Sequence, residues 1–156
     1  MFYMQMSLSS EISKLSETEM FLENLMQQFE IKEDFLGILS VPLNECVKNA
    51  IIHGNKYDKD KTVLIEVCLE QSKLLFSITD EGEGFDYDSF LTQDFEQSKT
   101  NGLFLIKVLT EDLSFSKNGA QISYKVDVPL TVSVNNKRID ILQQSQTVVK
   151  NSRMDI

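Results

Sequence analysis

Residues 43–55 read Leu-Asn-Glu-Cys-Val-Lys-Asn-Ala-Ile-Ile-His-Gly-Asn, and the whole interpretation of the chain starts from them. Apolar side chains recur there at i, i+4, i+7 and i+8, the spacing of one helix face, and they are Leu43, Val47, Ala50 and Ile51. Glu45 and Asn49 lie one turn apart on another face, and His53 continues their row. We therefore predict an amphipathic helix that presents Glu45 and Asn49 to one cleft. Taken alone, the spacing fits a solvated helix face better than a site.

Length and composition limit the class of protein. The chain has 156 residues, close to one ordinary domain. Hydrophobic residues make up 42% and charged residues 25%, with six Gly and two Pro, which excludes collagen-like, low-complexity and wholly disordered chains. Fifteen Lys and Arg oppose 24 Asp and Glu, so the net charge is -9. An acidic chain is repelled by a phosphate backbone, and no direct nucleic-acid binding is expected.

The same survey sets expectations for compartment and metal. No apolar run approaches the roughly 18 residues that cross a bilayer, and the first ten residues do not resemble a signal peptide. We expect a cytoplasmic protein without a membrane partner. Cys46 and Cys68 are too few for a disulfide framework, and His53 does not complete a zinc spacing with them. Zinc is therefore not expected.

The hydrophobic pattern predicts the element order β-α-α-β-β-α-β-β. The first helix is expected behind a capping box at Ser16 and Glu19, and the second is expected to kink at Pro42 or to restart behind Ser40. Asn118-Gly119 is a strong tight-turn signal between the last two strands. The predicted ranges are strand 5–14, helix 16–29, helix 33–53, strands 62–69 and 73–79, helix 102–109, and strands 113–116 and 121–128.

Two further segments carry residues suited to a ligand. Residues 80–85 follow a strand directly and read Asp-Glu-Gly-Glu-Gly-Phe, so a carboxylate and two permissive glycines sit where the chain must turn. Residues 100–103 place Gly102 at the start of a helix, whose free N–H groups can hold a phosphate. An ordinary acidic turn and a simple helix start are the plain alternatives. Glycines gather at the edges of all three segments, and this favours a ligand.

In order and spacing, the three segments resemble the Bergerat ATP-binding fold of gyrase, sensor histidine kinases and bacterial anti-sigma-factor kinases. Residues 43–55 resemble its N box, residues 78–86 its Asp-x-Gly-x-Gly box and residues 101–106 its second glycine box. The resemblance covers residues 8–128 and is closest to the single-domain anti-sigma-factor serine kinases, because the lid is short. It implies an α/β (α+β) two-layer sandwich, with a mixed, mostly antiparallel sheet and helices on one face. Residues 129–156 then form a C-terminal appendage.

The resemblance also implies a site for ATP and Mg²⁺. Glu45 would be the general base, Asn49 the Mg²⁺ ligand and Asp80 the acceptor of the adenine amino group. Glycines 82 and 84 would let the backbone pass the base, and Lys99 would add one positive charge. The full set of nucleotide contacts that the resemblance implies is Asn49, His53, Asp80, Gly82, Gly84, Phe85, Lys99, Thr100, Asn101, Gly102, Leu103 and Phe104.

The sequence departs from the family pattern at two places. Thr100 stands where the second glycine box usually begins with glycine, so a stiffer hinge is expected for the lid, residues 86–100. Ala120 and Gln121 stand where threonines usually support the adenine-binding aspartate. Either Gln121 or a water molecule could take over that support.

The resemblance implies a serine/threonine protein kinase that phosphorylates a small antagonist protein and regulates a sigma factor. It also implies a homodimer. The alternative from another class is an ATP-gated partner-binding protein without kinase activity, which Thr100 leaves open while Glu45 favours the kinase. A fragment of a sensor histidine kinase is a third and weaker possibility, because His53 lies within the nucleotide site.

Overall fold

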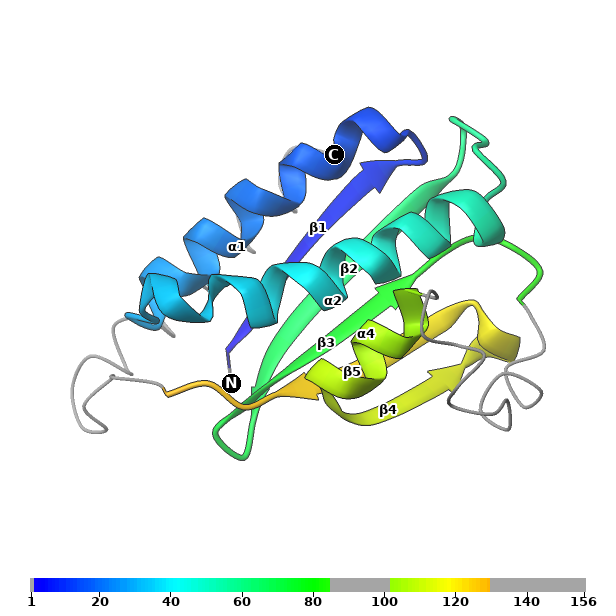
Figure 1. Cartoon of the computed structure of the whole chain (residues 1–156). Helices are drawn as coiled ribbons and strands as arrows, with labels where there is room; N and C mark the ends of the chain where they lie inside the picture. Colours follow the sequence, from blue (N-terminus) through cyan, green and yellow to red (C-terminus); the bar gives the residue numbers. More distant parts are fainter. Residues whose placement is uncertain (1, 85–101, 130–156) are drawn as a thin grey trace.

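The computed structural model describes residues 2–84 and 102–129. Within them, helices α1, α2 and α4 lie on one face of a five-stranded sheet (Figure 1). The elements follow the predicted order: β1 (Tyr3–Ser9), α1 (Ser16–Gln28), α2 (Leu36–Asn49), β2 (Thr62–Glu70), β3 (Lys73–Thr79), α4 (Gly102–Leu109), β4 (Glu111–Ser116) and β5 (Gln121–Val126). The predicted two-layer α/β fold class is confirmed.

The sheet has the strand order β1-β2-β3-β5-β4. All four pairings are antiparallel, so the described part lacks the parallel component of the mixed sheet that was expected. Ile65 of β2 faces Ile78 of β3, and Phe76 of β3 faces Tyr124 of β5. Side chains alternate between the two sheet faces, so these cross-strand neighbours form one apolar surface for the helices.

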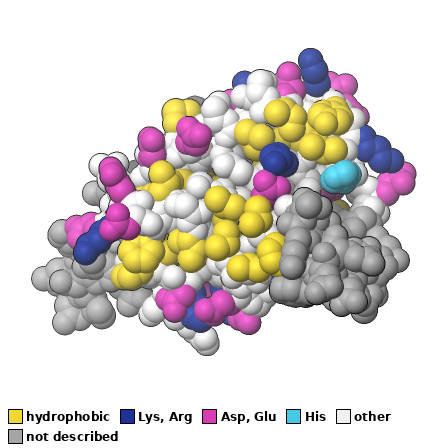
Figure 2. Space-filling view, in the orientation of Figure 1, with side chains coloured by type: hydrophobic (Ala, Val, Ile, Leu, Met, Phe, Trp, Pro, Cys, Tyr) yellow, Lys and Arg dark blue, Asp and Glu magenta, His cyan; other side chains and the backbone are white. Residues whose placement is uncertain are grey.

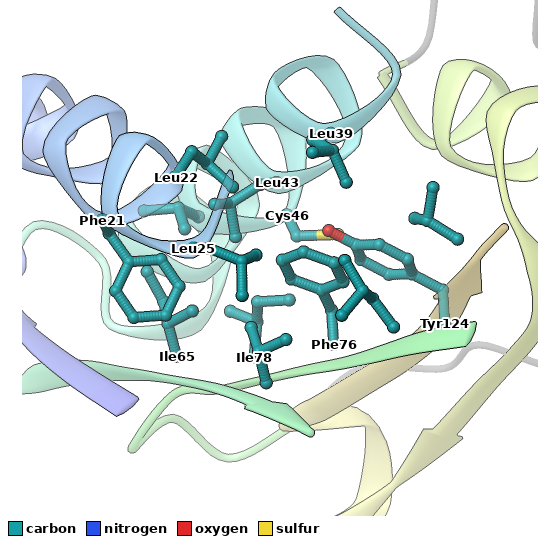
Figure 3. Close-up of a cluster of buried hydrophobic side chains, with 14 of the residues drawn as sticks. Phe21, Leu22, Leu25, Leu39, Leu43, Cys46, Ile65, Phe76, Ile78 and Tyr124 are labelled. Carbon is teal, nitrogen blue, oxygen red and sulfur yellow. The ribbon is translucent and has the colours of Figure 1, made fainter. Parts of the chain in front are cut away.

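The core lies between this apolar surface and the helices (Figure 3). Phe76 and Tyr124 stack with ring centroids 5.3 Å apart. The helices contribute fully buried leucines from α1 and α2, among them Leu22, Leu25, Leu39 and Leu43. Burying each such side chain stabilises the fold by roughly 1.5–3 kcal/mol relative to leaving it exposed. The position of α2 over the sheet is therefore strongly determined by packing.

The helix α2 runs through Pro42 without interruption, so the predicted restart behind Ser40 is wrong. A proline inside a helix costs about 3 kcal/mol, but Pro42 lies buried between Leu39 and Leu43, whose burial exceeds that cost. Behind Asn49 the chain continues as a π-helical turn, Ala50–Gly54.

The helical stretch Glu33–Gly54 is long and apolar enough to cross a membrane by length and composition alone, although no apolar run of that length was expected from the sequence. Its buried stripe packs in the core of this fold.

Two local expectations need correction, one is confirmed, and two concern residues outside the described ranges. The first strand ends at Ser9 rather than continuing to residue 14, because a 3₁₀ turn, Ile12–Leu15, follows it. No side chain caps α1, so the capping box is wrong; the Ser16 hydroxyl is instead 3.4 Å from the Ser13 carbonyl oxygen. The predicted turn at Asn118 is present, with a left-handed φ of 57°. The lid, residues 86–100, and the appendage after residue 129 lie outside the described residues.

Charged side chains of both signs are interspersed on the helix-covered face of the molecule (Figure 2). Hydrophobic side chains reach the surface between them. The large exposed ones among the described residues are Ile12, Met20, Leu36, Tyr57, Leu105 and Val108.

Candidate functional site

The α2 helix presents Glu45 on the side that contacts α4. Its Oε1 accepts a hydrogen bond from Lys48 Nζ at 2.8 Å. Its Oε2 lies against the α-carbon of Gly102, at the start of α4, where a Cβ would overlap the carboxylate. Two of the predicted segments are thus in direct contact, and a side chain at residue 102 would displace the Glu45 carboxylate.

Asn49 lies one turn further along α2, at the last residue of the helix. Its Nδ2 is buried and has no hydrogen-bond partner among the residues that the structure describes. Within the described ranges, no three His, Cys, Asp or Glu side chains form a group suited to a metal. An amide oxygen is a hard ligand that suits Mg²⁺, an ion that keeps several waters and takes ligands from phosphates. The Asn49 side chain carries such an oxygen, so it is chemically suited to a Mg²⁺ ion that is also bound by nucleotide phosphates.

Asp80 is the first residue of the loop that follows β3. Its carboxylate lies between Gly82 of the same loop and Gly54 at the end of the π turn. Its Oδ1 accepts the Gly82 N–H at 2.8 Å. A Cβ on Gly54 would lie 2.7 Å from Oδ1 and closer still to Oδ2, and a Cβ on Gly82 would overlap the Gly54 carbonyl. The loop from β3 and the end of the π turn are therefore in backbone contact around this carboxylate.

Burial raises the pKa of Asp80, while the Gly82 N–H and the charge of Lys61 act in the opposite direction. The Oδ2 atom has no hydrogen-bond partner among the described residues. A partly desolvated carboxylate is suited to accept a hydrogen bond from a ligand, because a donor there would stabilise its charge.

Gly84 brings the same loop against the turn before β5. Its φ is +86°, and a Cβ there would overlap the Asn118 carbonyl. Both conditions require glycine, as side chains disfavour that region of φ.

Some of the remaining predicted contacts lie within the described residues and others do not. His53 is exposed on the π turn, and Leu103 and Phe104 are half-buried on α4. Phe85, Lys99, Thr100 and Asn101 lie outside the described residues.

Gln121 does not support Asp80. Its Nε2 donates to Thr79 Oγ1 at 2.9 Å, and its Oε1 accepts from the Ser116 hydroxyl at 2.7 Å. Register explains this choice, because Gln121 lies directly opposite Thr79 across the β3–β5 pair. The sequence offered Gln121 or a water molecule as the support for Asp80. Gln121 is bonded to Thr79 and Ser116 instead.

Sequence reasoning missed Asn55 and Lys48. Asn55 is buried, and its Nδ2 donates to Ser10 Oγ at 2.7 Å and to the Thr62 carbonyl at 2.9 Å. Its Oδ1 accepts the Glu81 N–H at 2.8 Å, which fixes the loop that carries Asp80. The residues that follow Asn55, numbers 56–61, are charged or polar apart from Tyr57, so no hydrophobic pattern indicates a buried position there. The signal for Lys48 was available, since a lysine three residues after Glu45 can reach it on a helix.

The chain is similar to several known proteins. The serine-protein kinase RsbW of Bacillus subtilis is 23% identical over 159 residues, covering 96% of this chain and 94% of that protein. The anti-sigma F factor of Bacillus velezensis is 36% identical over 78 residues, which cover 47% of this chain and 53% of that protein. A histidine kinase domain from Erythrobacter litoralis is 20% identical with a TM-score of 0.43, covering 61% of this chain and 44% of that one. The sequence pattern of the histidine kinase-like ATPase domain matches residues 8–125, and the chain belongs to that family.

Proposed function

We propose that this protein is an ATP-dependent serine/threonine protein kinase that phosphorylates a small antagonist protein and regulates a sigma factor. The observation that carries the proposal is the Glu45 carboxylate, which contacts Gly102 where the N–H groups of α4 begin. A base is thereby next to the place where a helix N-terminus favours phosphates. Relatives that bear the names serine-protein kinase RsbW and anti-sigma F factor support the same proposal.

Each residue has one task in this proposal. Asp80 Oδ2 accepts a hydrogen bond from the amino group of adenine, and Asn49 would supply an amide oxygen to Mg²⁺. When bound, Mg²⁺ neutralises phosphate charge. Glu45 accepts the proton of a substrate serine hydroxyl as that oxygen bonds to the γ-phosphorus and the bond from phosphorus to ADP breaks. General-base assistance of this kind is worth roughly 10²- to 10⁴-fold.

Adenine selectivity tests the nucleotide half of the proposal. Guanine has a carbonyl where adenine has its amino group, so two acceptors would face each other at Asp80, at a cost of about 1–3 kcal/mol. Calorimetry should show ATP binding more tightly than GTP, and Asp80→Asn should weaken ATP binding strongly. Equal affinities for ATP and GTP in the parent protein would remove Asp80 from this role.

Phosphate transfer tests the catalytic half. The protein is incubated with labelled ATP, Mg²⁺ and the antagonist-type protein encoded nearest its gene. Phosphoserine on that protein is the expected product, and Glu45→Gln should keep ATP affinity while losing transfer. Asn49→Ala should instead weaken the Mg²⁺-dependent part of ATP binding. Transfer by Glu45→Gln at the parent rate would contradict the general-base role.

A second candidate function is an ATP-gated binding protein that transfers no phosphate. The observation in its favour is that one Glu45 oxygen already accepts the Lys48 ammonium and the other is packed on Gly102. ATP-dependent capture of a sigma factor without phosphoserine would establish it. In either case we propose a cytoplasmic homodimer whose partners are a sigma factor and an anti-sigma-factor antagonist protein.

A further inference from the structure

Lys48 forms an ion pair whose place in the fold is unusual. Its Nζ lies 2.8 Å from Glu45 Oε1, with the lysine side chain 41% exposed and the glutamate side chain 21% exposed. A pair three residues apart on an exposed helix contributes little to stability. This one, however, holds a carboxylate whose second oxygen is packed against Gly102.

A reference pair with the same spacing occurs elsewhere in the chain. Lys14 Nζ lies 3.1 Å from Glu17 Oε1, with side-chain exposures of 44% and 36%. It joins the short 3₁₀ turn before α1 to the first turn of that helix, and no residue of the candidate site takes part. The two pairs share the spacing of three residues, but only the Glu45 carboxylate lies in the candidate site.

Charge explains why Glu45 needs such a partner. Phosphates at the start of α4 would face this carboxylate, and like charges a few ångströms apart repel strongly in a partly desolvated site. α2 carries a single cation, Lys48, and α4 carries its only lysine, Lys107, in the last turn. Without Lys48, the repulsion would move the carboxylate away from the hydroxyl that it must deprotonate.

We propose that Lys48 is a positioning residue for phosphoryl transfer, an inference that rests on the proposed kinase function. Its ammonium has three donors on a flexible stem, and one of them holds Glu45 Oε1. The carboxylate is thereby kept at the start of α4 when phosphates arrive. Lys48 acts through Glu45 and is not required for nucleotide affinity.

The test is a double-mutant cycle of the parent, Lys48→Met, Glu45→Gln and the double variant, each measured for kcat of labelled-phosphate transfer and for ATP Kd. Lys48→Met should lower kcat roughly 10- to 100-fold through misplacement of the base, with Kd changed by less than about twofold. In the Glu45→Gln background it should cause no further loss, because there is no carboxylate to hold. Lys48→Arg should restore most of kcat.

Lys14→Met is the matched control and should leave both kcat and Kd unchanged. The inference is overturned if Lys48→Met transfers phosphate at the parent rate, if its loss multiplies with that of Glu45→Gln, or if it weakens Kd instead of kcat. Those results differ from failure of the proposed function itself, in which the parent protein already transfers no phosphate.

Discussion

Replacing Gly54 by alanine should displace Asp80 without harming the backbone. Gly54 is not among the glycines with positive φ, so alanine is sterically acceptable to the main chain there. The added methyl group would nevertheless lie 2.7 Å from Asp80 Oδ1 and closer to Cγ and Oδ2. Ordinary contacts of a Cβ begin near 3.4 Å. The carboxylate must therefore rotate or shift.

The net cost follows from three contributions. Alanine in place of glycine favours a helical residue by about 1 kcal/mol. Forcing Asp80 off its rotamer costs about 0.5–1.5 kcal/mol. Breaking its bond from the Gly82 N–H costs about 1.5 kcal/mol, the low end for a charged group because the carboxylate is only partly buried. We expect a net destabilisation of about 1–2 kcal/mol, or a Tm lower by roughly 2–8 °C.

Two control variants test whether the effect of Gly54→Ala comes from the contact with Asp80. Gly37→Ala, on α2 with nothing within 4 Å of the new methyl group, should raise stability by about 0.5–1 kcal/mol. In an Asp80→Ala background, Gly54→Ala should lose its cost because the clashing carboxylate is absent. Denaturant unfolding and ATP calorimetry are run on all variants, and Gly54→Ala should bind ATP roughly 5- to 150-fold more weakly. Parent-like ATP affinity, with stability equal to that of Gly37→Ala, would refute the reasoning.

Three more predictions concern buried polar groups. Tyr124→Phe should raise the free energy of unfolding by about 1 kcal/mol, because the buried hydroxyl has no hydrogen-bond partner among the described residues. If urea unfolding shows a destabilised variant, this hydroxyl does have a hydrogen-bond partner. Asn55→Ala should lower the free energy of unfolding by about 2–4 kcal/mol and weaken ATP binding, because three side-chain hydrogen bonds are lost. A free energy of unfolding equal to that of the parent would contradict this prediction. Because burial raises the folded pKa of Asp80 above 3.8, the folded state holds the extra proton, and stability falls as pH rises from the unfolded to the folded pKa. Asp80→Asn should remove this loss and be at least as stable as the parent at pH 7, which unfolding curves between pH 4 and pH 7 would check.

Local pattern determined most of the architecture. Alternation in residues 62–69 and 73–79 predicted β2 and β3 to within a residue, because one face of each strand must be buried. The helix Gly102–Leu109 was likewise predicted with its bounds. Two of the misses were at Ser16 and Pro42, where a local propensity competes with packing that the pattern does not contain.

The sequence by itself determined which residue types could form a nucleotide site, through Glu45, Asn49, Asp80 and the glycines in their order along the chain. Only the tertiary structure decided their contacts: Asp80 between Gly54 and Gly82, and Glu45 between Lys48 and Gly102. Periodicity records which face of an element is buried, a local property. Contacts between segments depend on strand register and on how helices pack across the sheet, which are set by the whole core at once.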